Sequence, residues 1–240
     1  MINIFRSIVT VLFVSFGLFA PVVAQQPQSS ASPSPAQTPV PQSSPSAPPV
    51  NEWTDDFGGG SLDAARWERH TFEGGGGRAQ IEGGQLRLRG MSGSRSGVRS
   101  QPTFTGDRFI VEATLARVGP AVPAPGEPST VSGNAILCVL FNGSERNRIE
   151  WILTSEGRFE AWSIVDGRGE RLDSNNLATQ QRTPTIGIVR RGDEYMFVLN
   201  GQIGLQRTIR NTPRNFRVML YGFGSSENNW DSVRVVTVRQ

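Results

Sequence analysis

The fold class is decided by residues 196–205, which read MFVLNGQIGL. Four apolar residues precede the pair Asn200-Gly201, and apolar residues continue after it. An Asn-Gly pair between two apolar runs is a strong signal for a type I′ β-hairpin, because both residues tolerate a positive φ. We therefore predict two antiparallel strands joined at this pair.

The same kind of turn recurs through the chain. Further turn signals separate short apolar runs at Asn142-Gly143, Glu156-Gly157, Asp166-Gly167 and Gly192-Asp193. The turns are spaced by roughly 8–12 residues, and no helical apolar period occurs after residue 50, which is typical of an antiparallel meander. About thirteen strands are too many for one flat sheet, so we expect an all-β, two-sheet sandwich.

The N-terminal fifty residues differ from the rest. Residues 1–24 have a basic start, an apolar run and small residues before Gln25, which predicts a secretory signal peptide; an uncleaved anchor is the alternative. Residues 25–50 are rich in Pro, Ser and Gln and predict a disordered linker. Residues 51–240 then form one domain. We expect a secreted, periplasmic or cell-surface protein with no membrane span after signal cleavage.

Charge and cysteine content exclude several classes of protein. All 24 basic residues are Arg, the net charge is +3, and acidic residues alternate with the basic ones, so nucleic-acid binding is not expected. The single cysteine, Cys138, lies in an apolar run and is predicted to be a buried, inert thiol. A secreted domain without disulfides needs a large core or a bound metal. We expect a monomer.

Short motifs at both ends of the domain resemble a known family. The opening has Asp55-Asp56-Phe57, then LDAARW at 62–67 and IEGGQLRL at 81–88, and the close has WDSVRV at 230–235. Together they are similar to the ends of concanavalin A-like lectin/glucanase domains, a group that includes laminin-G-like modules. The resemblance implies a jelly-roll β-sandwich whose bent sheets leave a concave face that binds glycans, with the first and last strands side by side.

The resemblance also implies a structural calcium ion. In that family the ion is held by backbone carbonyls near the start of the domain and by the Asp of the last strand, which matches Asp231 here. Asp56 and Gly83 fall in the segments that would supply carbonyls. Oxygen ligands of this kind suit Ca²⁺. The alternative is that Asp231 only caps the turn after Asn228-Asn229.

Aromatic and planar polar side chains mark a candidate glycan face. Sugar binding needs flat aromatic rings and paired hydrogen-bonding groups. The candidates lie on strands expected to be neighbours: Asn142, Arg148, Glu150, Trp151, Glu160, Trp162 and Tyr221. If Glu150 pairs with Glu160, Arg148 and Trp162 share their face and Trp151 enters the core, whereas a one-residue slip turns one strand over. The alternative is that both tryptophans lie in the core.

A catalytic function is a more specific hypothesis than glycan binding. Related glucanases carry "E-x-D-x-E" on one strand, but residues 146–153 hold the single carboxylate Glu150. Glu150 and Glu160 on neighbouring strands are the remaining route to a glycoside hydrolase. His70, the only histidine, is not expected to form a triad or a metal site, and Gly74–Gly77 is expected to be a flexible loop.

These observations favour a non-catalytic, lectin-like module that binds a polysaccharide or cell-surface glycan. A hydrolase using Glu150 and Glu160 and an adhesion domain that contacts protein are the alternatives. Gly119–Asn134 holds four prolines without a pattern and is expected to be a long loop.

Overall fold

A computed structural model describes residues 50–73, 77–90, 95–120, 133–173, 178–179, 181 and 183–238. These residues contain sixteen strands and no helix, and hence no helix that could cross a membrane. The predicted signal peptide, all of the predicted linker except Val50, and Gly74 to Gly76 lie outside the described residues. The expected all-β sandwich is confirmed.

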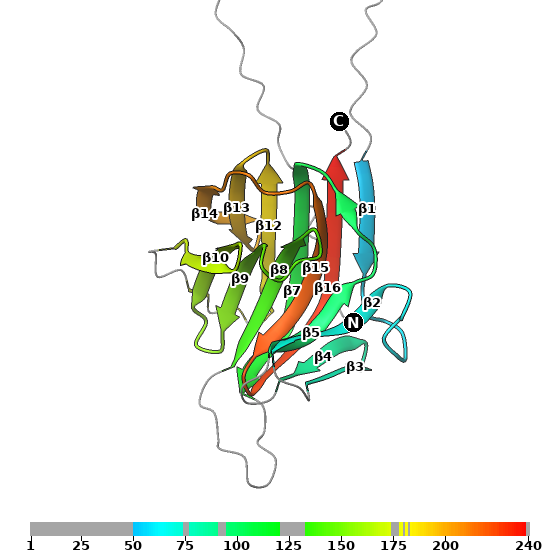
Figure 1. Cartoon of the computed structure of the whole chain (residues 1–240). Coiled ribbons are helices and arrows are strands. Elements are labelled where there is room, and N and C mark those ends of the chain that lie inside the picture. The colour runs from blue at the N-terminus through cyan, green and yellow to red at the C-terminus, as the bar shows by residue number, and fades with distance from the viewer. Residues whose placement is uncertain are drawn as a thin grey trace, which may run out of the picture. The chain divides into compact units, whose positions relative to one another are not determined.

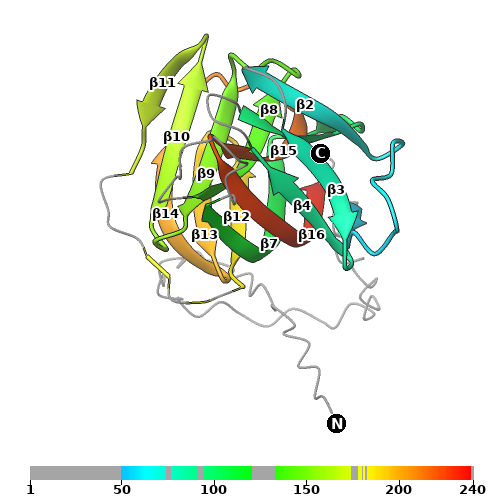
Figure 2. The ribbon, with the colours of Figure 1, turned by 90° about the horizontal axis from the view of Figure 1, so that it is seen from below.

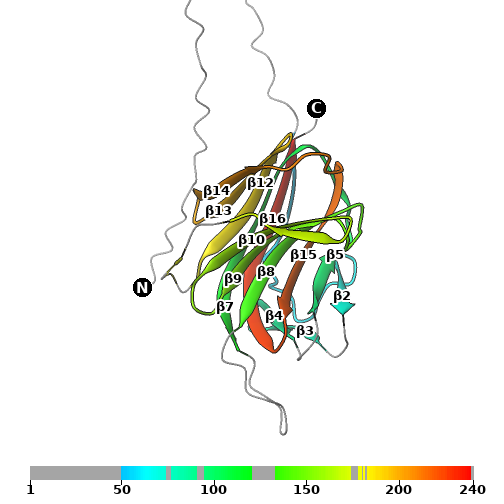
Figure 3. The same cartoon turned by 60° about the vertical axis from the view of Figure 1, so that its left-hand side comes forward.

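The strands form two antiparallel sheets, which we call sheet A and sheet B (Figure 1). Sheet A consists of β14 (Gln202–Thr208), β13 (Glu194–Leu199), β12 (Thr185–Arg191), β7 (Arg108–Pro120), β16 (Ser226–Val238), β4 (Gln85–Arg89) and β3 (Arg78–Glu82), with β1 (Val50–Asp55) also paired to β16. Sheet B consists of β11 (Arg168–Arg171), β10 (Phe159–Val165), β9 (Arg148–Thr154), β8 (Asn134–Phe141), β15 (Asn215–Phe223), β5 (Arg95–Ser100) and β2 (Trp67–Glu73), with β6 (Phe104–Thr105) also paired to β15. Figure 2 and Figure 3 show the two layers from two sides.

The core lies between the sheets and follows strand alternation. On β7, Phe109, Val111, Ala113 and Leu115 alternate along the strand and are buried, and the residues between them are partly exposed. Inward residues of sheet B, such as Trp151, complete the core from the other side. Burial of this continuous apolar layer is the main stabilising contribution and explains how the domain folds without a disulfide.

The predicted turns are confirmed by backbone geometry. Asn200 and Gly201 have φ values of 51° and 78° and join β13 to β14, as a type I′ turn requires. Asn142-Gly143 and Asp166-Gly167 also have positive φ at both residues. The hairpins therefore follow local turn chemistry, which fixes the register of the strands that carry the candidate residues.

The two ends of the domain meet in sheet A. β1 pairs antiparallel with β16, from Val50 opposite Val238 to Asp55 opposite Val233 (Figure 1). This is the arrangement that the resemblance implied, and it covers the edge of half of β16. The first strand begins at Val50, the last residue of the predicted linker. In the expected loop Gly119–Asn134, β7 extends to Pro120 and β8 starts at Asn134, while residues 121–132 lie outside the described residues.

Candidate functional site

Five of the seven candidate glycan residues meet on the face of sheet B that points away from sheet A, here called the outer face. Glu150 on β9 lies opposite Trp162 on β10, and Glu160 lies opposite Ile152. Because side chains two residues apart share a face, Arg148, Glu150, Glu160 and Trp162 all point outward, as the first predicted register required. The pairing differs from that prediction by two residues, so the two glutamates are diagonal neighbours rather than direct partners.

These side chains border a hollow of about 540 Å³, here called the outer groove. Its lining comes from six strands and the turn after β10. The residues are Arg95, Asn134, Ile136, Arg148, Glu150, Ile152, Thr154, Glu160, Trp162, Ile164, Gly167, Gly169, Tyr221 and Phe223. Apolar and polar groups alternate along it, and its charged members are two arginines and two glutamates. The charge of the groove is therefore balanced.

The floor of the groove is fixed by a buried triad of Arg148, Glu150 and Tyr221. The Arg148 guanidinium donates to a Glu150 carboxylate oxygen at 2.5 Å, and the Tyr221 hydroxyl donates to the same oxygen. Burial raises the pKa of Tyr221 well above its ordinary value, and the negative charge of Glu150 adds to this. Burial opposes the charge of Arg148, but Glu150 outweighs it and raises the pKa of the guanidinium. The phenol and the guanidinium therefore both stay protonated and hold the carboxylate in place.

Trp162 supplies an aromatic surface at the groove. Its side chain is half-buried, and its indole N–H donates to Glu160 Oε2 at 3.1 Å. Arg171 on the edge strand β11 reaches the other oxygen of Glu160 at 3.7 Å. The indole ring is thus held in one orientation by its neighbours, with polar groups at its edge. A fixed ring beside hydrogen-bonding groups is what sugar recognition requires.

Two further residues of the groove were missed by the sequence analysis. Phe223 at the end of β15 is 49% exposed, and the Arg95 guanidinium lies 5.0 Å from the centre of its ring. Phe223 follows Tyr221 by two residues on the same strand, so strand alternation could have assigned its side chain to the same face as that of Tyr221. Arg95 had no such signal, because its strand is placed beside β15 only by the tertiary fold.

Two predicted ligand residues are corrected. Trp151 is fully buried between the sheets, where its ring stacks on Phe159 and its N–H donates to Val198 O at 3.1 Å. Strand alternation turns it away from Trp162, so it cannot touch a ligand. Asn142 lies in the turn after β8 with φ of 51°, and its side chain does not line the groove. It serves the turn instead.

The predicted burial of Cys138 is confirmed, since the residue has no exposed surface. Burial, together with the charge of Glu150, raises the pKa of its thiol well above the ordinary value. His70 lies on β2, and its Nε2 is 2.8 Å from Glu145 Oε1.

Two of the calcium candidates, Gly83 and Asp231, lie near one another at one end of sheet A. Gln85 Nε2 donates to Asp231 Oδ1 at 2.7 Å, and Gly83 is in the turn two residues before Gln85. Asp56 Oδ1 accepts from the N–H of Gly58 at 3.0 Å. Near Asp231, the buried Oδ1 of Asn229 has no hydrogen-bond partner within the protein. The donor atoms available here are oxygens, which fit Ca²⁺, although none of these contacts brings Asp56 to Asp231.

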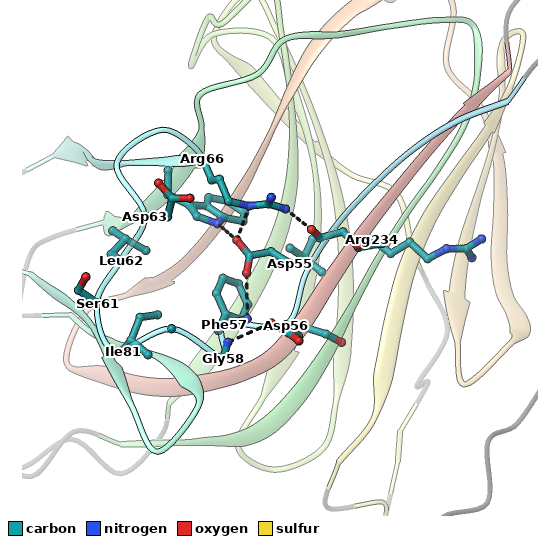
Figure 4. A pocket seen from close by; sticks show the side chains of 15 residues that line it. Asp55, Asp56, Phe57, Gly58, Ser61, Leu62, Asp63, Arg66, Ile81 and Arg234 are labelled. Atoms are coloured by element: carbon teal, nitrogen blue, oxygen red, sulfur yellow. Dashed lines mark hydrogen bonds and ion pairs between the residues drawn. The ribbon is translucent and has the colours of Figure 1, made fainter.

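A second hollow, of about 480 Å³, lies between the end of β1 and the loop that leads to β2 (Figure 4). Asp55 organises it: its carboxylate accepts from the N–H of Phe57 at 2.9 Å, from Arg66 Nε at 2.9 Å and from the Trp67 indole at 2.8 Å. All these donors belong to the protein itself. We therefore interpret this hollow as structural, because the hydrogen bonds of Asp55 fix the loop of the opening motif.

No protein-family model and no curated protein matches the chain. Solved structures match over most of its length. One, from the work "Prominent members of the human gut microbiota express endo-acting O-glycanases to initiate mucin breakdown", has a TM-score of 0.58 at 14% identity and covers 78% of this chain and 99% of its own. SCLam, a non-specific endo-β-1,3(4)-glucanase from family GH16, has a TM-score of 0.56 at 13% identity. The match covers 82% of this chain and 95% of SCLam.

A Bacillus licheniformis β-glucanase gives a TM-score of 0.55 at 13% identity and covers 78% of this chain and 98% of its own. At these identities the likeness shows the fold, and it confirms the concanavalin A-like jelly roll that the end motifs predicted. The likeness in fold does not assign the activities of these proteins to this chain.

Proposed function

We propose that the outer groove binds a neutral glycan. The observation that carries the proposal is the fixed, half-buried Trp162 beside Glu160, in a hollow that also holds Arg148, Glu150 and the exposed Phe223. The charges of the lining cancel, so an uncharged ligand rich in hydroxyl groups suits it better than a strongly anionic one. The matched solved structures named above are glycanases, which supports a carbohydrate ligand.

The hydrogen bonding of the two glutamates favours binding without catalysis. Glu150 accepts from Arg148 and Tyr221, and Glu160 accepts from Trp162. A glycosidase needs one carboxylic acid that donates a proton to the leaving oxygen. Both carboxylates here are used as acceptors and are held by the protein itself, so we propose a lectin-like module.

The register supports a second candidate function, glycoside hydrolysis. Diagonal neighbours on adjacent strands lie roughly 7–8 Å apart at Cα, and the side chains of Glu150 and Glu160 point the same way. Carboxyl groups about 5–10 Å apart span the separations that retaining and inverting glycosidases use. The register therefore puts two carboxylates on one face of adjacent strands, an arrangement compatible with a hydrolytic pair.

Binding is tested by calorimetric titration with β-1,3- and β-1,4-linked gluco-oligosaccharides and with mucin O-glycans. Trp162→Ala should weaken the affinity for whichever probe binds by about tenfold or more, as expected for a central tryptophan. Val165→Ala, a change at an exposed position on the same strand, should leave the affinity unchanged. Absence of binding by the unmodified protein to all three probes at millimolar concentration would contradict the proposal and favour the alternative of a protein-contacting adhesion domain.

Hydrolysis is tested by the release of reducing sugar from the same probes. The lectin-like proposal predicts no release. Release that disappears in both Glu150→Gln and Glu160→Gln, while circular dichroism shows that both variants are folded at the assay temperature, would instead establish the hydrolase. We also propose that the protein is exported from the cell. We further propose that Asp231 and nearby carbonyl oxygens hold a structural calcium ion.

A further inference from the structure

We infer that the outer groove is blind on its β2 side and takes the terminal units of a glycan chain rather than its interior. This inference rests on the proposed glycan binding and adds which part of the ligand is recognised. It starts from a cluster of buried side chains that the sandwich core does not explain.

Five residues on the outer face of sheet B are buried although they point away from sheet A. They are Ile136, Cys138, Leu140, Met219 and Tyr221, with Phe72 and Ile152 packed against them. Cys138, Leu140 and Met219 have no exposed surface at all. Side chains in the middle of an open binding face would be accessible to ligand, so something covers this part of the face.

The cover begins with Phe72 on the edge strand β2. Thr71 pairs with Ser96 and Glu73 pairs with Arg95, so Phe72 is the extra residue of a β-bulge. A bulge bends its strand and redirects side chains. The Phe72 ring packs edge-on against Tyr221, with ring centres 5.2 Å apart, and lies 5.0 Å from the Arg148 guanidinium.

These contacts show how strongly sheet B curls. β2 and β9 are separated by β5, β15 and β8, which on a flat sheet would place them about 19 Å apart at ~4.8 Å per strand. Phe72 of β2 nevertheless contacts Arg148 of β9. The edge strand therefore leans over the outer face, and its side chains close the space above the middle strands.

A second contact of β2 also covers the outer face. His70 on β2 lies 2.8 Å from Glu145, which is in the turn between β8 and β9, and Arg148 donates to the backbone carbonyl of Glu145. Phe72, His70, Glu145 and Arg148 thus form a continuous wall, here called the barrier. It closes the groove toward β2 and toward the β8–β9 turn.

The opposite side of the groove is bordered by the exposed edge strand β11. Gly169 on this strand has no side chain, and a Cβ there would lie 3.7 Å from the Trp162 ring. The glycine therefore leaves the ring accessible from β11. From Trp162 the groove continues over β9, β8 and β15 to Arg95 on β5, the strand next to β2, and the barrier of Phe72 and Arg148 closes it there, so only the last units of a chain that enters over Trp162 fit inside.

The inference is tested by binding stoichiometry. The probes are linear β-1,3- and β-1,4-glucan chains of increasing defined length, titrated calorimetrically into the full-length protein. Recognition of a terminus predicts one protein per chain at every length, and Phe72→Ala should make the number of proteins per chain rise with length. Phe104→Ala, which removes another partly buried ring, serves as the control and should leave one protein per chain.

The outcomes separate the two proposals. If the unmodified protein binds several copies per long chain, glycan binding stands and terminal recognition is overturned; this arm needs no variant. If Phe72→Ala folds and still binds one copy per chain, the barrier is not the cause and the inference also fails. If no glycan binds, the proposed function fails first and the inference with it.

Discussion

The triad of Arg148, Glu150 and Tyr221 carries charge where water hardly reaches. The side chains of Arg148 and Glu150 are 11% and 7% exposed. A buried ion pair contributes little compared with apolar packing, but removing one member leaves the other buried and uncompensated. The free energy of folding should therefore depend far more on the intact triad than on the exposed ion pairs elsewhere.

Glu150→Ala should lower the free energy of unfolding by about 3 kcal/mol or more, because Arg148 and the Tyr221 hydroxyl lose their acceptor. Urea unfolding followed by circular dichroism measures the change. Glu160→Ala is the matched control: this carboxylate is 32% exposed, and its loss should change the free energy of unfolding by less than about 1 kcal/mol. Equal losses in the two variants would contradict this account of the triad.

Both tyrosines of the chain, Tyr195 and Tyr221, are buried, and this predicts alkaline sensitivity. Burial raises the pKa of Tyr195 to about 12, and that of Tyr221 lies well above its ordinary 10.0. Between pH 10 and 12 the unfolded chain thus binds fewer protons than the folded one, so stability is complete below pH 10 and falls as the pH rises through this window.

Tyrosinate absorbance in the native protein should stay flat near pH 10 and rise only together with unfolding. In guanidinium chloride both tyrosines should titrate near their ordinary pKa, which serves as the reference. Reversible ionisation of one tyrosine near pH 10, with unchanged circular dichroism, would show that its ring is accessible in the folded state.

At the scale of elements, β1 and β16 matter most for the integrity of sheet A. The C-terminal half of β16 pairs with β7 on one side and with β1 on the other. β1 also contributes Trp53, which packs against Trp67, and Asp55, which organises the following loop. Without β1, half of β16 would become an exposed apolar edge.

Truncation tests this role of β1. A chain that starts at Pro48 should unfold at the same temperature as the full chain, because the compact unit begins there. A chain that starts at Asp56 should lose several kcal/mol of stability and aggregate, because it lacks the strand and its anchors. Thermal unfolding with light scattering distinguishes the two truncated chains. If the shorter chain melts like the longer one, the pairing with β16 is dispensable.

At the scale of the whole molecule, the ends of the domain meet close to the proposed calcium ligands. An ion there would join the β3–β4 turn to β16 and stabilise the folded state by mass action. EDTA should therefore lower the melting temperature, and added Ca²⁺ should restore it. In Asp231→Asn the effect of EDTA should be lost, whereas Asp63→Asn, at an exposed loop position, should keep it. An unchanged melting temperature with EDTA would remove calcium from the proposal.

The sequence by itself determined the features that depend on local chemistry. Asn-Gly and Asp-Gly pairs set the hairpins, and the end motifs indicated the jelly roll. It also placed Glu150, Glu160 and Trp162 on one face under the first of its two registers. Local rules suffice there because turn geometry and pleating involve residues that are close in the chain.

Only the tertiary structure decided which residues form the groove. The choice between Trp151 and Trp162 depended on register, since a slip by one residue reverses every side chain. Arg95, Phe223 and the barrier depend on β15, β5 and β2 being placed beside strands distant in the sequence, and on the curl of sheet B. Such contacts come from the packing of the whole sandwich, and no local pattern around Phe72 or His70 records them.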